Sequence, residues 1–179
     1  MNSKKTIQIL VTIAAILICF PCFATIPKEE MTIGDIYIGQ PAQEVFEKYG
    51  KPVSQEEMYG NKKLNYIIKN NYGLTNSFAV ITKETNYKAI TGVSLTANIG
   101  LKTKAGIGIG STKEEITQIY GKPDSCTDPT GSPISIDKTD YQGAFELKYK
   151  ADNNEPYELK ITLEGPEHKV TAIGIGVAQ

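Results

Sequence analysis

The sequence predicts an α+β fold made by tandem duplication of one unit, a short helix followed by three or four antiparallel strands. Residues 36–52 (IYIGQPAQEVFEKYGKP) and 107–123 (IGIGSTKEEITQIYGKP) are identical at eight of their 17 positions. Each copy carries the start and stop signals of a helix, and strand-like segments follow each copy. A repeat of this kind predicts two copies of one supersecondary unit.

The helix of the second copy has clear signals at both ends. Ser111 is a favourable N-cap, and Glu114 three residues later completes a capping box. Gly121 suits the left-handed position that ends many helices, and Pro123 prevents the helix from resuming. The sequence therefore predicts a helix of about nine residues between these signals, which is too short to be stable in isolation.

The helix of the first copy is predicted between Pro41, at the first helical position, and Gly50. In both copies the apolar residues recur at helical spacing, which places them on one face. These apolar faces consist of Val45, Phe46 and Tyr49 in the first helix, and of Ile116, Ile119 and Tyr120 in the second. Both faces need a sheet to cover them.

Strand-like runs supply that sheet. Apolar and polar residues alternate in them, and short polar turns separate them. The predicted strands are 63–69, 77–83 and 88–97 after the first helix, and 144–150, 157–164 and 170–177 after the second. The junction at 98–106 lacks the composition of a flexible linker. The predicted units are therefore residues 25–101 and 102–179, rigidly joined.

The first 24 residues are predicted to be a signal peptide. Lys4 and Lys5 precede an uncharged, largely apolar run that Pro21 ends, and cleavage is expected after Ala24. The protein is then secreted or periplasmic and has no membrane insertion after cleavage. Lipid attachment at a cysteine is the alternative, but residues 18 and 21 are not the small residues that this usually requires.

Composition argues against nucleic acid as a partner and against a disulfide-stabilised scaffold. The formal net charge is −1 and arginine is absent, so nothing favours nucleic acid. The chain contains no tryptophan. Cys126 is the single cysteine left after cleavage, so the mature protein has no internal disulfide.

No catalytic, metal or cofactor site is predicted. The only histidine, His168, lies in a Gly-Pro-Glu-His turn and is interpreted as a solvated turn residue. Residues 152–155 lack the glycine and the ligand alternation of a calcium loop. The glycines of residues 106–110 alternate with isoleucine, which is typical of a strand. Glu44 and Glu115 are explained by the helix dipole.

Tyrosine is the residue type that we expect to mediate recognition, because it combines a large contact area with one polar group. The chain has ten tyrosines. Several of them fall on strands or loops after the helices, where a concave sheet would present them. The predicted binding residues are Tyr66, Tyr72, Asp140, Tyr141 and Tyr149.

The two repeated segments resemble the β-lactamase-inhibitor-protein-like (BLIP-like) fold. They share I-x-I-G, a capped helix with Glu and Val or Ile, and Y-G-K-P followed by antiparallel strands. The unit is also similar to small outer-membrane assembly lipoproteins of the SmpA/OmlA (BamE) type. The resemblance implies a concave sheet and a non-enzymatic, protein-binding role. The chain departs from the inhibitors in lacking tryptophan and disulfides, and from the lipoproteins in having two units.

These observations lead to three hypotheses. The preferred one is an exported, non-catalytic module that binds another protein of the cell envelope or extracellular space, as an inhibitor or accessory factor. The second is a structural or assembly component that contacts its partners through the helices. The third is a hydrolase with an unrecognised site. Exposed aromatics on the sheet favour the first, an apolar stripe left on the helices favours the second, and a deep pocket around His168 or Cys126 favours the third.

Overall fold

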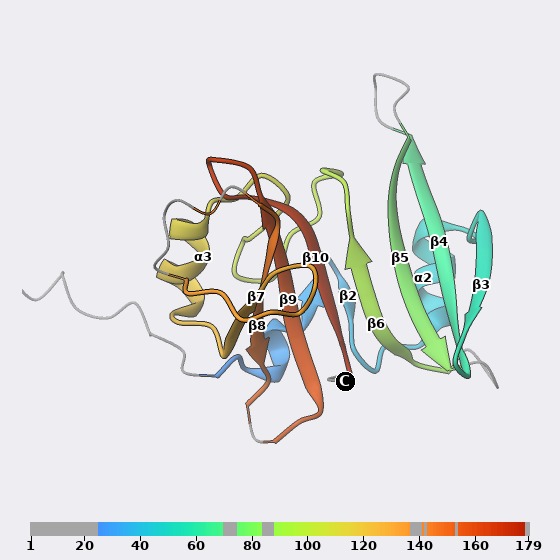
Figure 1. The fold of residues 1–179 in the computed structure, drawn as a ribbon. Coiled ribbons are helices and arrows are strands. Elements are labelled where there is room, and N and C mark those ends of the chain that lie inside the picture. The colour runs from blue at the N-terminus through green and yellow to red at the C-terminus, as the bar shows by residue number, and fades with distance from the viewer. Residues whose placement is uncertain are drawn as a thin grey trace, which may run out of the picture.

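The computed structural model describes residues 25–69, 75–83, 88–136, 141, 143–152 and 154–177. Its main element is an eight-stranded sheet in the order β3-β4-β5-β6-β10-β9-β8-β7. All neighbouring strands of this sheet are antiparallel. Two short α-helices lie against it (Figure 1). The predicted α+β class is confirmed.

The elements follow one another in two similar series, in which a helix precedes four strands. The first part of the chain contains η1 (Lys28–Glu30), β1 (Thr32–Ile33), β2 (Ile36–Tyr37), α2 (Ala42–Tyr49), β3 (Ser54–Met58), β4 (Asn61–Lys69), β5 (Thr75–Lys83) and β6 (Ile90–Leu95). The second part contains α3 (Lys113–Tyr120), β7 (Ser125–Thr127), β8 (Phe145–Lys150), β9 (Tyr157–Glu164) and β10 (Lys169–Val177).

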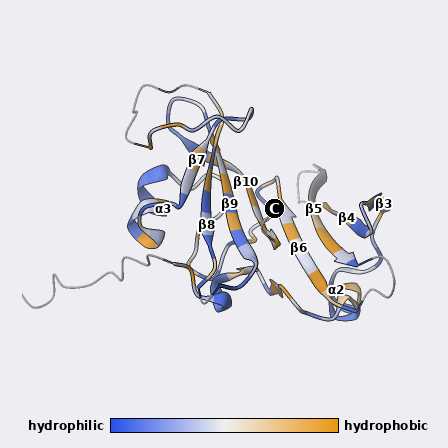
Figure 2. Ribbon diagram, turned by 60° about the horizontal axis from the view of Figure 1, so that its bottom comes forward, coloured by the Kyte–Doolittle hydropathy of each residue, from blue (hydrophilic) through white to orange (hydrophobic). Residues whose placement is uncertain are grey.

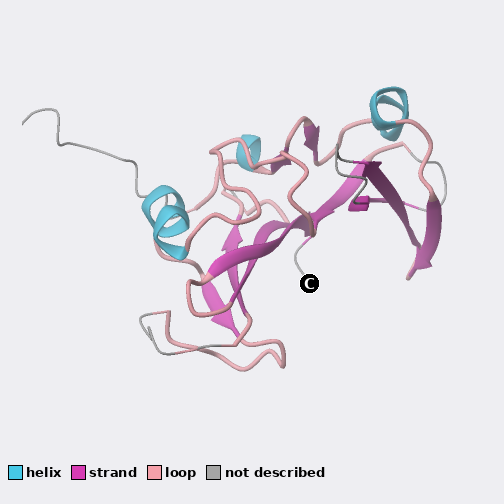
Figure 3. Cartoon of the chain, turned by 90° about the horizontal axis from the view of Figure 1, so that it is seen from above, coloured by secondary structure: helices cyan, strands magenta, loops and turns pink. Residues whose placement is uncertain are grey.

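The two α-helices lie on the same side of the sheet (Figure 3). Bands of apolar and polar residues alternate along the strands (Figure 2), as expected for a sheet with one buried face. The core therefore lies between the helices and the sheet. We call the opposite side the helix-free face.

Two rows of buried side chains cross the sheet on the helix side and join its two halves. Each row runs through directly opposed residues of successive strands. One row consists of Tyr66, Phe78, Leu95, Ile173, Ile161, Leu147 and Cys126. The other consists of Leu64, Val80, Val93, Ile175, Leu159 and Tyr149. Because both rows pass through the β6–β10 pair, one core extends across the middle of the sheet.

The six predicted strands correspond to β4, β5, β6, β8, β9 and β10, whereas the sequence missed the two outermost strands. All five residues of β3 are exposed, so no apolar alternation marks this strand. Strand β7 has only three residues. Edge strands bury little side-chain area, which removes the pattern by which a strand is recognised.

The predicted cap of the second helix is wrong by one residue. Thr112 is the N-cap, and it forms a capping box with Glu115 rather than the expected pair Ser111 and Glu114. The carbonyl of Ser111 instead accepts a hydrogen bond from the N–H of Val170 at 2.8 Å. This contact with β10 holds Ser111 outside the helix. In the first helix Pro41 is likewise the N-cap, and Ala42 is the first helical residue.

Replacing Gly121 by alanine is expected to lower the free energy of unfolding by about 1–3 kcal/mol. Gly121 ends α3 with φ 74° and ψ −152°, a conformation that is essentially restricted to glycine. Urea unfolding measures the effect. Gly174→Ala is the control, because an added Cβ there would meet only the Val93 carbonyl oxygen, at 3.9 Å. Equal losses in both variants would contradict this explanation.

The junction between the two series packs against the first part of the chain. The N–H of Gly34 donates to the carbonyl of Lys102 at 2.7 Å. The Thr103 hydroxyl accepts from the Tyr120 hydroxyl at 2.7 Å and from the Ile107 N–H at 3.1 Å.

Within the described part of the chain, no helix has the length and apolar character needed to cross a bilayer.

Candidate functional site

Two of the predicted binding residues lie in the core. Tyr66 is 3% exposed and its ring stacks on Phe78 with centroids 4.8 Å apart. Tyr149 is 2% exposed and donates its hydroxyl to the carbonyl of Gly121 at 3.2 Å. Burial raises the pKa of Tyr66 to about 12. The expected outward placement of these two tyrosines is corrected, because both point toward the helices and neither offers contact area to a partner.

Tyr141 is partly buried and held in place by the histidine that the sequence assigned to solvent. His168 is only 6% exposed, so its interpretation as a solvated turn residue is wrong. Its Nε2 donates to the carbonyl of Tyr141 at 2.8 Å, and its ring meets Phe145 edge-on. The Tyr141 ring also contacts Phe145. His168 therefore fastens the segment before β8 to the turn before β10.

Neither the other two predicted binding residues nor Cys126 adds a functional group to a site. Tyr72 and Asp140 lie outside the described residues. Cys126 forms no disulfide and is 8% exposed on β7. Burial raises the pKa of its thiol, which disfavours the reactive thiolate.

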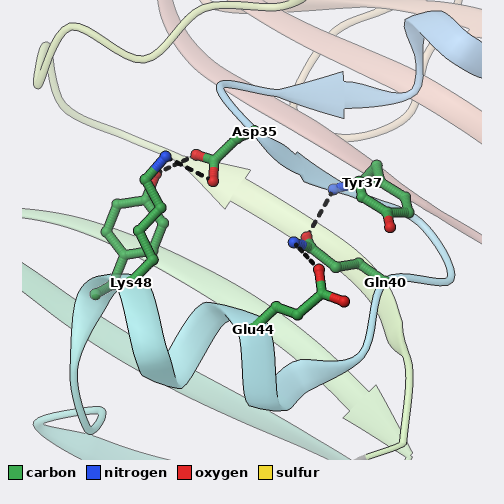
Figure 4. Close-up of polar contacts among 6 residues, drawn as sticks. Asp35, Tyr37, Gln40, Glu44 and Lys48 are labelled. Atoms are coloured by element: carbon green, nitrogen blue, oxygen red, sulfur yellow. Dashed lines mark hydrogen bonds and ion pairs between the residues drawn. The ribbon is translucent and has the colours of Figure 1, made fainter.

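A polar cluster fixes α2 to the β1–β2 turn (Figure 4). The Asp35 carboxylate accepts from the Tyr49 hydroxyl at 2.5 Å and lies 2.8 Å from the Lys48 ammonium. At the other end of the helix, the Gln40 side chain accepts from the Tyr37 N–H and donates to Glu44. These contacts orient the helix, and the cluster contains no activated nucleophile.

Replacing Asp35 by asparagine is expected to reduce the loss of stability at acidic pH. Burial raises the pKa of Asp35, but hydrogen bonds from Lys48 and Tyr49 outweigh burial and hold this pKa below its ordinary value of 3.8. A carboxylate with a depressed pKa contributes stability above its unfolded pKa, and the contribution is lost as pH falls through the folded pKa. Urea midpoints at pH 6 and pH 3 should therefore differ less in the variant than in the parent.

The Tyr49→Phe variant checks the origin of this effect, since it removes one hydrogen bond and keeps the carboxylate. Its acid sensitivity should fall between those of the parent and the Asp35→Asn variant. An unchanged pH profile in both variants would show that the cluster does not contribute to acid stability.

Among the described residues, the most exposed aromatic side chain lies on the turn between β3 and β4. Tyr59 is 104% exposed and has φ 48°, and Gly60 follows with φ 78°. Met58 pairs with Asn61, so these two residues form a two-residue hairpin turn with positive φ at both positions. Such turns favour Asn, Asp or Gly at the first position, and a tyrosine there is strained. No packing contact accounts for a large, strained, fully exposed ring.

Tyr59 borders a hollow of about 330 Å³ that extends across both halves of the sheet. Met58, Ile81 and Val177 contribute apolar surface to it, and Met58 and Val177 are themselves exposed. Glycines 174 and 176 of β10 keep its centre open. Lys83 and Lys160 are its charged lining residues, and no carboxylate belongs to the lining. Lys160 also pairs with Glu158 at 2.6 Å.

The sequence reasoning missed this surface. The local signal was Gly60 in the Tyr-Gly dipeptide at 59–60, because glycine suits the second position of a two-residue hairpin turn when strands flank it. Because β3 lacks apolar alternation, the flanking strand was not recognised and the dipeptide had no context.

No family model and no curated protein matches this chain. Among solved structures, the chain is similar to a cysteine-rich secretory protein from Staphylococcus aureus, with 18% identity and a TM-score of 0.53 over 88% of this chain and 49% of that chain. It also matches an extracellular protein containing an SCP domain from Bacillus anthracis, with 11% identity and a TM-score of 0.47 over 90% and 49% of the two chains. The chain spans about half the length of each of these proteins.

The predicted resemblance to the BLIP-like family is therefore wrong. The structural similarity is to the cysteine-rich secretory protein, and at 18% identity it concerns the fold alone. The motifs behind the prediction describe a capped helix and its stop, which are local features. Local signals of this kind do not specify how the following strands assemble into a sheet.

Proposed function

We propose that this protein is an exported, non-catalytic module that binds another protein of the cell envelope or extracellular space through the surface around Tyr59. The partner presents an apolar recess for the tyrosine ring and carboxylates toward Lys83 and Lys160. Export is supported by the apolar N-terminal segment and by a fold shared with a secretory protein.

The observation that carries the proposal is the full exposure of Tyr59 in a strained turn. Strain of this kind persists where function requires it. An exposed tyrosine beside apolar surface is typical of residues that dominate binding energy. Of the two lysines that line the neighbouring hollow, Lys160 is already paired with Glu158, and Lys83 supplies the positive charge that favours an acidic partner surface.

The two alternatives have less support. The exposed positions of both helices are polar (Gln43, Glu44, Glu47 and Lys48 on α2, and Glu114, Glu115 and Gln118 on α3), so no apolar stripe favours contact through the helices. For a hydrolase, neither His168 nor Cys126 lines the hollows found beside the sheet. The ring of His168 is instead used to fasten Tyr141.

We also propose that the two halves descend from a duplicated unit. The order helix and four strands occurs twice, and the pairs Leu95–Ile173 and Val93–Ile175 exchange under a two-fold operation centred on Ser94 and Gly174. In that case the surface around Tyr59 is a feature that only the first half acquired. A tight turn joins β3 to β4, whereas a long segment joins β7 to β8.

Affinity capture from envelope and culture-supernatant fractions tests the function. The protein and its Tyr59→Ser and Tyr37→Ser variants are immobilised in parallel. Tyr37 is a matched control because it is 45% exposed and lies on the helix side. We expect a partner that the parent and the Tyr37 variant retain, with affinity for the Tyr59 variant reduced by at least about 30-fold.

Circular dichroism of the three proteins should be identical, since neither side chain supports the core. A partner retained equally by all three proteins, or no partner in either fraction, would contradict the proposal.

A further inference from the structure

The edge formed by β3 is open to another strand. β3 is the first strand in the sheet order, so one of its sides pairs with β4, and no strand among the described residues pairs with the other. All of its residues, Ser54–Met58, are exposed. An open edge of this length has backbone donors and acceptors that an added strand can use.

A groove runs beside this edge. It has a volume of about 640 Å³ and lies between α2 and the start of β3. Gln43, Phe46 and Glu47 of the helix line one side, and the lining is completed by Gly50, Lys51, Pro52 and Gln55, so it holds one carboxylate and one ammonium group. Phe46 is only partly buried, so the groove has an apolar contact for one side chain.

The charges along β3 indicate which segment fits. Glu56 and Glu57 are consecutive residues of this five-residue strand. Within the sheet Glu56 pairs with Lys63 and Glu57 pairs with Lys62. Glu56 lies 3.9 Å from the Lys63 ammonium, and its side chain remains 56% exposed. A second strand on the open side meets the same carboxylates, so opposite charge there is favourable and like charge is not.

We propose that β3 binds an extended, lysine- or arginine-containing segment of another protein by strand addition. Side chains alternate across a strand, so Gln55, which lines the groove, and Glu57 lie on the helix side, and Glu56 lies on the helix-free side. The bound segment places one apolar residue against Phe46 and basic residues beside the carboxylates. A second copy of this chain does not fit, because pairing two β3 edges brings glutamates together.

This inference goes beyond the proposed function and uses a different surface. The groove lies on the helix side of the sheet, whereas Tyr59 borders the hollow on the helix-free face. The binding of a partner at Tyr59 and the addition of a strand at β3 can therefore be tested separately. The Tyr59→Ser variant should bind the basic segment as the parent does.

Amide chemical shifts of the isotope-labelled protein test the proposal. The probe is the capped peptide Thr-Lys-Val-Thr-Lys, whose two lysines lie on opposite faces of an extended chain, and the control peptide has glutamate in place of both lysines. We expect the lysine peptide to shift the amides of Ser54–Met58 and of the groove-facing residues of α2. The glutamate peptide should leave them unchanged. A Glu56→Lys, Glu57→Lys variant should bind the lysine peptide about tenfold more weakly and prefer the glutamate peptide.

Several outcomes would overturn the proposal. Shifts by the lysine peptide that avoid β3, or equal binding of both peptides, would exclude charge-selected strand addition. Concentration-dependent dimerisation that shifts the same β3 amides without peptide would assign the edge to a second copy. If the charge-reversal variant loses its fold, the single variants Glu56→Gln and Glu57→Gln should each weaken binding by a smaller factor.

Discussion

Leu95→Ala is expected to lower the free energy of unfolding by about 3 kcal/mol and to destabilise both halves of the sheet together. Leu95 is fully buried on β6, between Phe78 of β5 and Ile173 of β10. It is a central member of a buried row that crosses the sheet. Truncation there leaves a cavity shared by the two halves, and a close-packed core relaxes into such a space only in part.

Urea unfolding and amide exchange measure this prediction together. The unfolding midpoint should fall without a change in slope, and protection should decrease equally in β4–β5 and in β8–β9. Ser94→Ala is the control, since Ser94 lies next to Leu95 on the helix-free face, and its effect should stay within about 0.5 kcal/mol. Loss of protection confined to β4–β5 would show that the halves unfold independently.

Tyr59→Asn is expected to abolish detectable capture of the partner and to make the protein more stable at the same time. Asparagine adopts positive φ more readily than tyrosine and suits the first position of this turn. Tyr59 is fully exposed, so the substitution removes no core packing. We expect a gain in the free energy of unfolding of about 0.5–1 kcal/mol, together with a loss of affinity of at least about 30-fold.

Thermal unfolding and the affinity capture described above measure the two effects in one variant. Tyr59→Phe separates them, because it keeps the ring and the backbone strain. It should retain most of the affinity and show no gain in stability. A Tyr59→Asn variant that is more stable and still binds the partner would contradict the role of the Tyr59 ring in recognition.

Local pattern predicted the regular elements well where one face is buried. The apolar faces of both helices and the alternation of six strands are periodic in the sequence, and the structure has an element at each of these places. The glycines after Tyr49 and Tyr120 end both helices with positive φ, as their position indicated. Periodicity reports burial, so it is reliable only where a residue's environment repeats along the chain.

The failures have long-range causes. Ser111 is not the N-cap of α3, because Val170 of the distant strand β10 hydrogen-bonds to its carbonyl. His168 is buried because its partner Tyr141 lies 27 residues earlier in the chain. Alternation placed Tyr66 and Tyr149 on strands but did not reveal which face the helices cover. Tyr59 was missed because its flanking strand has no apolar residue facing the core.

The sequence alone determined the α+β class, the two helices with their stops and the six strands that bury a face. Each of these depends on the order of side chains along a short stretch of chain. The tertiary structure decided the strand order, the central β6–β10 pairing, the burial of His168 and the open surfaces at Tyr59 and β3. These features depend on contacts between residues far apart in the chain, and no local periodicity encodes them.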